Sequence, residues 1–227
     1  MPVLREDAPV NLRALLHPGA WDAWCRWAHL DTPGSALGPL VAAHPEALPE
    51  LAALAGVDQD PHWHPEGDVL VHVLLAADRA AQLCTAQRID GEERTMLVLA
   101  ALLHDVGKPT CTRLREGRIT SRGHAQAGVR PARTFCERAG APERLVAAVG
   151  RLVAEHMTVH STPTPSVGAV ERLAARLAPV TLRQWALLVD ADKNGRGRPP
   201  APSPAEPWLR VAAAQGIVSG GPHTHQL

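Results

Sequence analysis

The sequence predicts an all-α helical bundle that carries one small β-hairpin. Apolar residues make up 45% of the 227 residues, and most of them are Ala, Leu and Val, a balance that favours helices. Along most segments the apolar positions recur at steps of three and four, as they do on the inward face of a helix. A strand-like pattern appears between Cys111 and Thr120, where Glu116-Gly117 is the expected turn.

The composition narrows the class of protein. Lys plus Arg and Asp plus Glu both number 23, so no global field indicates nucleic acid or a membrane as partner, although a local basic site stays possible. The four cysteines show no paired spacing, which argues against a zinc knuckle or a disulfide framework. No signal-like segment follows Met1, and we find no apolar run of the ~18 residues that a membrane span needs. We therefore expect a soluble, cytoplasmic protein without a membrane partner. There is no DNA-recognition motif, and the oligomeric state is left open.

Helical and proline-rich stretches divide the chain into three parts. Residues 1–60 are predicted to form an N-terminal helical segment packed on the core, with a helix within Pro45–Leu54. The core follows at 61–198. The last part, 199–227, is expected to comprise a stiff, exposed, proline-rich connector, a short helix at Trp208–Gln215 and a disordered tail.

The central helix leads to the first candidate site residues. Met96–Leu103 is uniformly apolar, which indicates a buried helix, and we expect Asp90 and Glu93 to begin that helix as a capping box. His104 and Asp105 follow at its C-terminal end, where the helix dipole favours a cation. A buried His-Asp pair without compensation would be costly, so we predict a metal ion beside it.

Three further histidines are placed inward on predicted helices. His72 lies beside the apolar stripe of a helix that Asp68 caps, and His124 begins another helix directly after Gly123. His156 continues an apolar line at steps of four, three and four. Taken singly, each of them is more typical of a structural histidine than of a ligand.

Two aspartates compete near the end of one later helix. Asp192 falls on the apolar line of Leu182, Trp185 and Val189, whereas Asp190 lies on a more outward face. An unpaired inward carboxylate needs a partner, which a metal ion would supply. Periodicity therefore favours Asp192 as the functional residue and leaves Asp190 as the weaker candidate.

Weaker candidates flank these positions. His64 sits in a proline-rich loop, and His160 comes one turn after His156. Lys108 could reach an anionic ligand of the metal, although a lysine there would equally complement the helix dipole. Arg196 is a second candidate for contact with an anion.

Six residues share one property, because each sits at an end or on the inward side of a predicted helix. They are His72, His104, Asp105, His124, His156 and Asp192. A helical bundle can bring such positions to one ligand. Imidazoles and carboxylates suit Mn, Ni, Co, Fe or Zn without choosing among them. Six ligands exceed the four typical of one zinc, so we predict two divalent transition-metal ions bridged by Asp105.

The order His72, His104-Asp105, Asp192 resembles the signature of the HD-domain metal-dependent phosphohydrolases, and the added histidines are similar to those of members with dinuclear sites. A closer resemblance, from about Leu48 to Arg198, is to the HD domain of bacterial tRNA CCA-adding enzymes. The segments that carry it are Gln59–Asp68, Leu102–Pro109, Gly123-His124 and Ala191–Arg196. A nucleotidyltransferase signature is lacking, and there is no room for that domain before residue 48, so we expect no nucleotide addition.

The resemblance implies hydrolysis of 2′,3′-cyclic phosphates and 2′-phosphates on nucleotides or RNA ends, as in CCA-linked HD domains and in similar modules fused to RNA-end-healing kinases. Metal-activated hydroxide, from a water whose pKa falls towards ~7, would attack phosphorus in line. Asp105 and Lys108 would be catalytic, and Lys108 and Arg196 would contact the substrate. No residue stands out as the general acid.

Two other interpretations remain at this stage. The same metals could serve an HD-type 5′-nucleotidase or a dinucleotide polyphosphate hydrolase. Alternatively, the domain could be a non-catalytic module that binds a metal and a nucleotide. Neutral net charge and few aromatic residues favour a small substrate or a single RNA end over a long tract.

Overall fold

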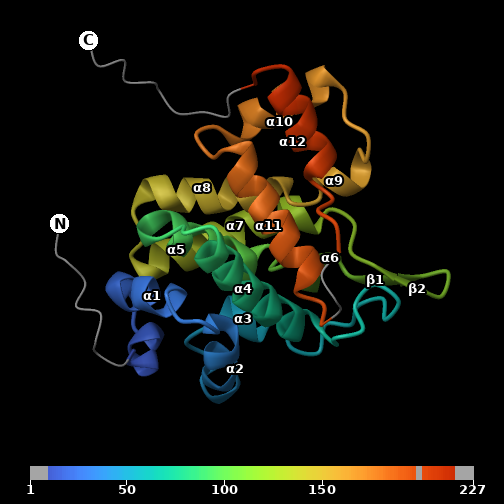
Figure 1. The fold of residues 1–227 in the computed structure, drawn as a ribbon. Coiled ribbons are helices and arrows are strands. Elements are labelled where there is room, and N and C mark those ends of the chain that lie inside the picture. The colour runs from blue at the N-terminus through green and yellow to red at the C-terminus, as the bar shows by residue number, and fades with distance from the viewer. Residues whose placement is uncertain (1–9, 198–200, 218–227) are drawn as a thin grey trace, which may run out of the picture.

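The computed structural model describes residues 10–197 and 201–217, whose regular secondary structure is helical apart from one two-stranded hairpin (Figure 1). The predicted all-α class is thereby confirmed. In chain order the elements are η1 Leu12–Leu16, α1 Trp21–Ala28, α2 Pro33–Ala43, α3 Pro49–Ala52, α4 Val69–Ala86, α5 Gly91–Leu103, α6 Lys108–Cys111, β1 Arg113–Arg115, β2 Arg118–Thr120, α7 His124–Ala139, α8 Glu143–Glu155, α9 Thr158–Ser161, α10 Val167–Leu177, α11 Leu182–Asn194 and α12 Glu206–Ala214.

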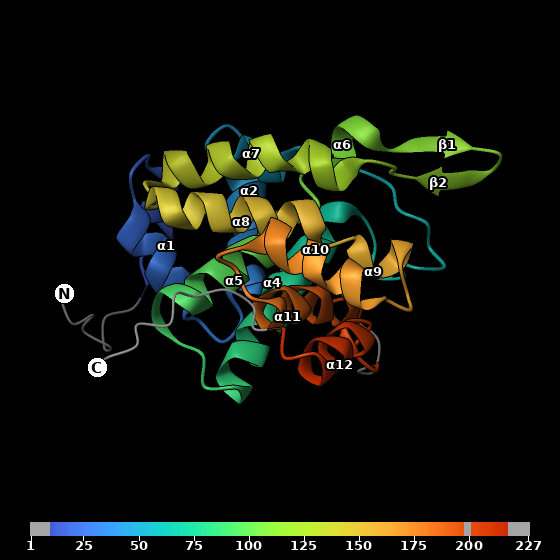
Figure 2. The same ribbon diagram turned by 90° about the horizontal axis from the view of Figure 1, so that it is seen from above.

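Helix α5 occupies the centre of the bundle. Every residue from Arg94 to Leu103 is buried, as its uniformly apolar sequence predicts. Helices α4, α8, α1 and α11 pack around it, and α7 lies alongside α8 (Figure 2). Because other helices surround α5, His104 and Asp105, which follow it directly, are buried in the core.

The N-terminal helices pack on this core and are tied to it by two buried charges. Arg94 donates hydrogen bonds to the carbonyls of Ala28 and Leu30 at the end of α1. Asp78 accepts hydrogen bonds from the backbone of Gly34 and Ser35, which satisfies amides at the start of α2. Arg94 and Asp78 thus have structural partners, and neither belongs to the cluster of candidate metal ligands described below.

Several local expectations were wrong. The Asp90 side chain makes no capping hydrogen bond, because its carboxylate instead lies 2.8 Å from Nε2 of His29. The helix expected within Pro45–Leu54 is only the single turn Pro49–Ala52, which a proline begins. The described part of the proline-rich connector is not freely exposed: the amide of Ala201 donates to Asn194 of α11. The expected disordered tail lies outside the described residues.

Helix α4 also corrects an expectation about membranes. Its 18 residues, Val69–Ala86, are long and apolar enough to cross a bilayer by length and composition. Half of that stretch is buried, however, and its buried residues include His72 and Asp78. The helix packs against α2, α5 and α11, as a core helix does.

Candidate metal centre

Five helical segments bring the six predicted ligands to one place. His72 comes from α4, and His104 and Asp105 follow α5. His124 begins α7, His156 follows α8, and Asp192 lies near the end of α11. All six are buried. Sequence spacing alone therefore selected residues that the fold gathers into one cluster.

Asp105 lies between two groups of histidines. Its Oδ2 is 3.2 Å from Nε2 of His104 and 3.7 Å from Nε2 of His72. Its Oδ1 is 3.0 Å from Nε2 of His124 and 3.8 Å from Nε2 of His156. Each carboxylate oxygen thus faces a different pair of imidazoles, which is the arrangement required of a bridging ligand.

Asp192 completes the first of these groups. Its Oδ1 lies 3.2 Å from Nε2 of His72 and 3.9 Å from Nε2 of His104. One group therefore has two histidines, Asp192 and one oxygen of Asp105. The other group has His124, His156 and the second oxygen of Asp105.

Backbone carbonyls fix the tautomer of three of the rings. Nδ1 of His104, His124 and His156 lies 2.7 to 2.8 Å from the carbonyl three residues earlier in the chain. A carbonyl can only accept, so each Nδ1 carries a proton, and in the neutral form of each ring Nε2 presents its lone pair. The three Nε2 atoms are thereby prepared as metal ligands.

The donor set fits divalent metal ions. Nε2 of His72 is 3.2 Å from Nε2 of His104, and Nε2 of His124 is 3.0 Å from Nε2 of His156. Lone pairs facing each other in a buried place repel unless a proton or a cation lies between them. Imidazole nitrogens and carboxylate oxygens are the ligands of borderline transition metals. The cluster therefore has the chemistry of a site for such ions.

The electrostatics of the cluster follow from its burial. Burial alone raises the pKa of Asp105, but Lys108 and His104 outweigh it and hold that pKa well below its usual range. The same competition, with His72 as the main partner, holds the pKa of Asp192 well below its usual range. Burial lowers the pKa of His156 to about 3. The carboxylates are therefore anionic and His156 is neutral, as metal ligands must be.

Lys108 points its charge at the carboxylate of Asp105. Its Nζ lies 2.7 Å from Oδ2 of Asp105 and donates a hydrogen bond of 2.6 Å to Oε1 of Gln59. It stands at the start of α6, a few residues after the end of α5, and its charge is directed at Asp105. Arg196 lies 3.0 Å from Oδ1 of Asp192. Both predicted substrate contacts therefore border the cluster.

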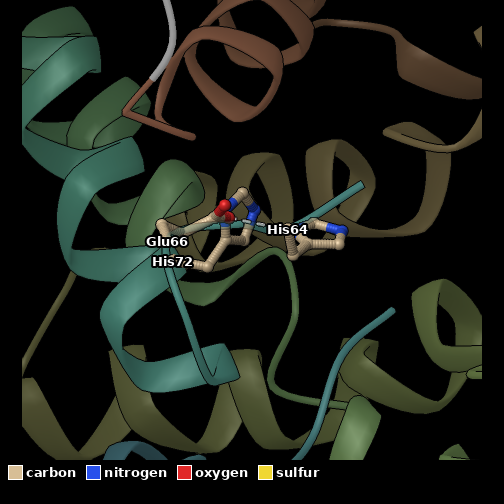
Figure 3. Close-up of side chains that lie close together, drawn as sticks. All are labelled: His64, Glu66 and His72. Carbon is tan, nitrogen blue, oxygen red and sulfur yellow. Dashed lines mark hydrogen bonds and ion pairs between the residues drawn. The ribbon is translucent and has the colours of Figure 1, made fainter. Parts of the chain in front are cut away.

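Sequence reasoning missed Glu66, whose carboxylate lies close to His72 (Figure 3). Its Oε1 is 2.8 Å from Nδ1 of His72 and 2.9 Å from Nδ1 of His64. The contact with His72 has the length of an ion pair without the angle of a hydrogen bond. Burial alone raises the pKa of Glu66, but the two histidines lower it to about 2. A signal was present, because Glu66 lies within the segment that carries the family resemblance.

The weaker candidates fall around the cluster. His64 is held by Glu66, and burial lowers its pKa. His160 lines the groove into which the cluster opens, and burial likewise lowers its pKa. Asp190 is half-buried, and no salt bridge within residues 10–197 and 201–217 joins it to any of the six ligands.

A backbone contact holds the two sides of the cluster together. Gly107 follows Asp105, and a Cβ on it would lie 2.1 Å from the carbonyl oxygen of His124 and 2.6 Å from the amide nitrogen of Gly128. A side chain would therefore force α7 away from the end of α5. The missing side chain permits the short distance between Asp105 and His124.

The cluster opens into a groove of about 1600 Å³. Asp105, Lys108, His124, His156 and Asp192 all line it. On its walls stand Trp63, Arg122, Met157, Lys193 and Arg196. A substrate in the groove can thus reach both halves of the cluster.

Comparison with known proteins agrees with this geometry. The family model of the HD domain matches residues 69–193, more than half of the chain. The chain is 36% identical over 173 residues to a Multifunctional CCA protein of Xanthomonas campestris pv. campestris, covering 74% of this chain and 40% of the relative. The Multifunctional CCA protein of Stenotrophomonas maltophilia is 32% identical over 206 residues, which cover 86% of this chain and 48% of the relative. That of Halorhodospira halophila is 34% identical over 222 residues, which cover 94% of this chain and 51% of the relative.

The chain thus spans about half or less of the length of these relatives. The family match begins at the first residue of α4 and extends almost to the end of α11. It therefore includes all six residues of the cluster. The chain belongs to the HD domain family.

Proposed function

We propose that this chain is a cytoplasmic metal-dependent phosphohydrolase that removes 2′,3′-cyclic or 2′-phosphates from nucleotides or RNA ends. The observation that carries the proposal is the position of Asp105. Its two oxygens face two groups of buried imidazoles, and Lys108 lies 2.7 Å from one of these oxygens at the floor of the groove. Divalent ions held by these side chains, together with Lys108, would concentrate positive charge beside a nucleophile, as phosphate chemistry requires.

The residues of the chain have separate tasks in this proposal. His72, His104 and Asp192 would hold one divalent ion, His124 and His156 would hold the other, and Asp105 would bridge them. When bound, such ions act as Lewis acids and lower the pKa of water. Lys108, positioned by Gln59, places a cation where negative charge builds on the phosphoryl oxygens.

The walls of the groove support a nucleotide substrate. Trp63 is 58% exposed and lines the groove, so its ring is available to stack on a base. Arg196 and Lys193 stand on the same groove and could contact phosphate. The relatives that share the domain carry CCA in their names, which is consistent with a substrate at an RNA end.

Substrate profiling tests the proposal. Protein loaded with Mn²⁺, Ni²⁺ or Co²⁺ is assayed on 2′,3′-cyclic nucleotides, 2′-monophosphates and 5′-monophosphates, with Asp105→Asn as the inactive control. We expect turnover of the first two substrates and its loss in the variant. Release of phosphate from 5′-monophosphates alone would show an HD-type 5′-nucleotidase instead. Absence of turnover in protein that holds its metal would favour a binding module.

A further inference from the structure

The β-hairpin carries a concentration of positive charge that the net charge of the chain conceals. In Figures 1 and 2 it projects from the bundle beyond α6 and α7. Its register sets Arg113 opposite Thr120 and Arg115 opposite Arg118. Residues opposite each other share a face, so the three arginines lie on one face of the hairpin, and all three are exposed.

This arrangement is unfavourable for the hairpin by itself. Arg115 and Arg118 are directly opposite, and like charges in that position destabilise a strand pair. Across residues 10–197 and 201–217, no salt bridge involves any of the three arginines. The turn adds strain, since Glu116 has a φ of +50°. An anionic ligand on this face would relieve the repulsion.

The hairpin is continuous with the groove. Ile119 of β2 and the following Ser121 and Arg122 line the groove wall. Arg122 is exposed, lines the groove and precedes the ligand His124 by two residues. Ile119 lies on the face of the hairpin opposite the arginines, so positive charge is carried by Arg122 on the groove wall and by Arg113, Arg115 and Arg118 on the other face of the hairpin. A chain of phosphates that ends in the groove would meet this charge on its way out.

We propose that the arginine face, Arg113, Arg115 and Arg118, binds the phosphodiester backbone of an RNA whose end enters the groove. The proposal rests on the proposed function for the position of that end. This proposal adds to the proposed function a separate binding surface, which favours RNA termini over free nucleotides. Guanidinium groups bind phosphates in a bidentate manner, without reading sequence.

An anionic membrane is the competing partner, because Leu114 is 74% exposed on the same hairpin. Leu114 pairs with Ile119, however, and so lies on the face opposite the arginines. A bilayer would need the apolar and basic side chains on one surface. RNA fits the observed separation better, because the basic face is left free for phosphates.

Fluorescence anisotropy with a labelled RNA stem-loop that ends in a 3′-hydroxyl tests the proposal, since binding is then measured without hydrolysis. The metal-loaded protein is compared with R113Q/R115Q/R118Q and with R13Q/R88Q/R172Q, which removes the same charge from exposed positions outside the groove. We expect the hairpin variant to bind about tenfold or more weakly, and its log–log salt slope to fall by about 2, at about 0.7 per phosphate contact. The control should bind as the parent does.

Further measurements decide between explanations. R115K/R118K keeps the charge and should retain most of the affinity, which separates charge from loss of the hairpin. Equal losses in both triple variants, or no loss in the hairpin variant, overturn the proposal. Binding to vesicles rich in phosphatidylserine that depends on the hairpin, with RNA binding unchanged, would show a membrane surface instead. Because the RNA carries no 2′- or 2′,3′-cyclic phosphate, failure of the proposed hydrolysis would leave this result standing.

Discussion

The Nε2 atoms of His124 and His156 lie 3.0 Å apart, while the Nδ1 atom of each ring is bonded to a backbone carbonyl. Two neutral rings held in this way present lone pairs to each other. The backbone thus maintains a contact that is favourable only with a cation nearby. Two buried histidines 32 residues apart can therefore face each other in a well-packed core when a cation lies beside them.

Removal of metal should therefore destabilise the protein. Ligand present at about 100 times its Kd stabilises the native state by about 2.7 kcal/mol, or about 5–10 °C in Tm for a chain of this size. Differential scanning fluorimetry before and after dialysis against a chelator measures the shift, and re-addition of Mn²⁺ should reverse it. A Tm that does not respond to chelator or to added ions would contradict the assignment of the cluster.

Asp192 and Asp190 form a matched pair for testing the ligand set. Asp192→Asn should lower metal affinity by about 100-fold or more, because a charged ligand of the His72 group is lost. Asp190→Asn should keep its metal, since burial already raises the pKa of Asp190 towards the neutral form that asparagine mimics. Metal content by elemental analysis after gel filtration distinguishes them. The reverse pattern would mean that Asp190 is the ligand.

Glu66 should tune the ion beside His72. A carboxylate behind a ligating imidazole raises its basicity, and loss of such a partner weakens metal binding by about 10- to 100-fold. Glu66→Gln should therefore weaken one of two sites in a calorimetric titration and leave the other unchanged. Glu46→Gln is the control, because Glu46 also faces a histidine, His44, but at the exposed surface and 3.8 Å away. Equal effects of the two substitutions would rule out this role.

Lys108 should act on the rate. Lys108→Met removes the cation beside Asp105, and loss of one such contact lowers kcat by about 10²–10³-fold. Lys193→Met is the comparison, since Lys193 lines the same groove without an ion pair to the six ligands in the described part of the chain. Steady-state kinetics on the best substrate from the profile measures both. If Lys193→Met costs as much as Lys108→Met, general charge in the groove accounts for the effect.

The cysteines should differ in their reactivity. Burial raises the pKa of Cys136 to about 12 and the pKa of Cys84 and Cys25 to about 11. A raised pKa leaves little of the reactive thiolate at pH 8, so these three should be alkylated slowly. Cys111, half-exposed in α6, should be modified first by iodoacetamide in peptide mapping. In denaturant all four should react alike, and labelling of native Cys136 as fast as Cys111 would contradict the packing.

Much of the cluster could be predicted because its ligands belong to periodic helices. His156 was found from its apolar line, and Asp192 was preferred over Asp190 for the same reason. Glu66 lies in a loop with two prolines nearby, where no period tells which side chains face inward. Its role becomes visible only when the fold brings that loop against α4.

Composition alone could not predict the basic face of the hairpin. Equal numbers of acidic and basic residues gave no global sign of a polyanion as partner and left a local basic site open. The hairpin itself was predicted, but only its register shows that Arg113, Arg115 and Arg118 share one face. A balanced total can thus contain a local surface of one sign.

The contact of Gly107 with His124 and Gly128 has a consequence for metal selection. It makes the separation between the two halves of the cluster a property of the main chain, which relaxes far less than a rotamer does. An ion of unsuitable radius can then be accommodated only by lengthening its own bonds. Gly107→Ala should therefore weaken the binding of metal, because its Cβ would displace the backbone that carries His124 away from Asp105.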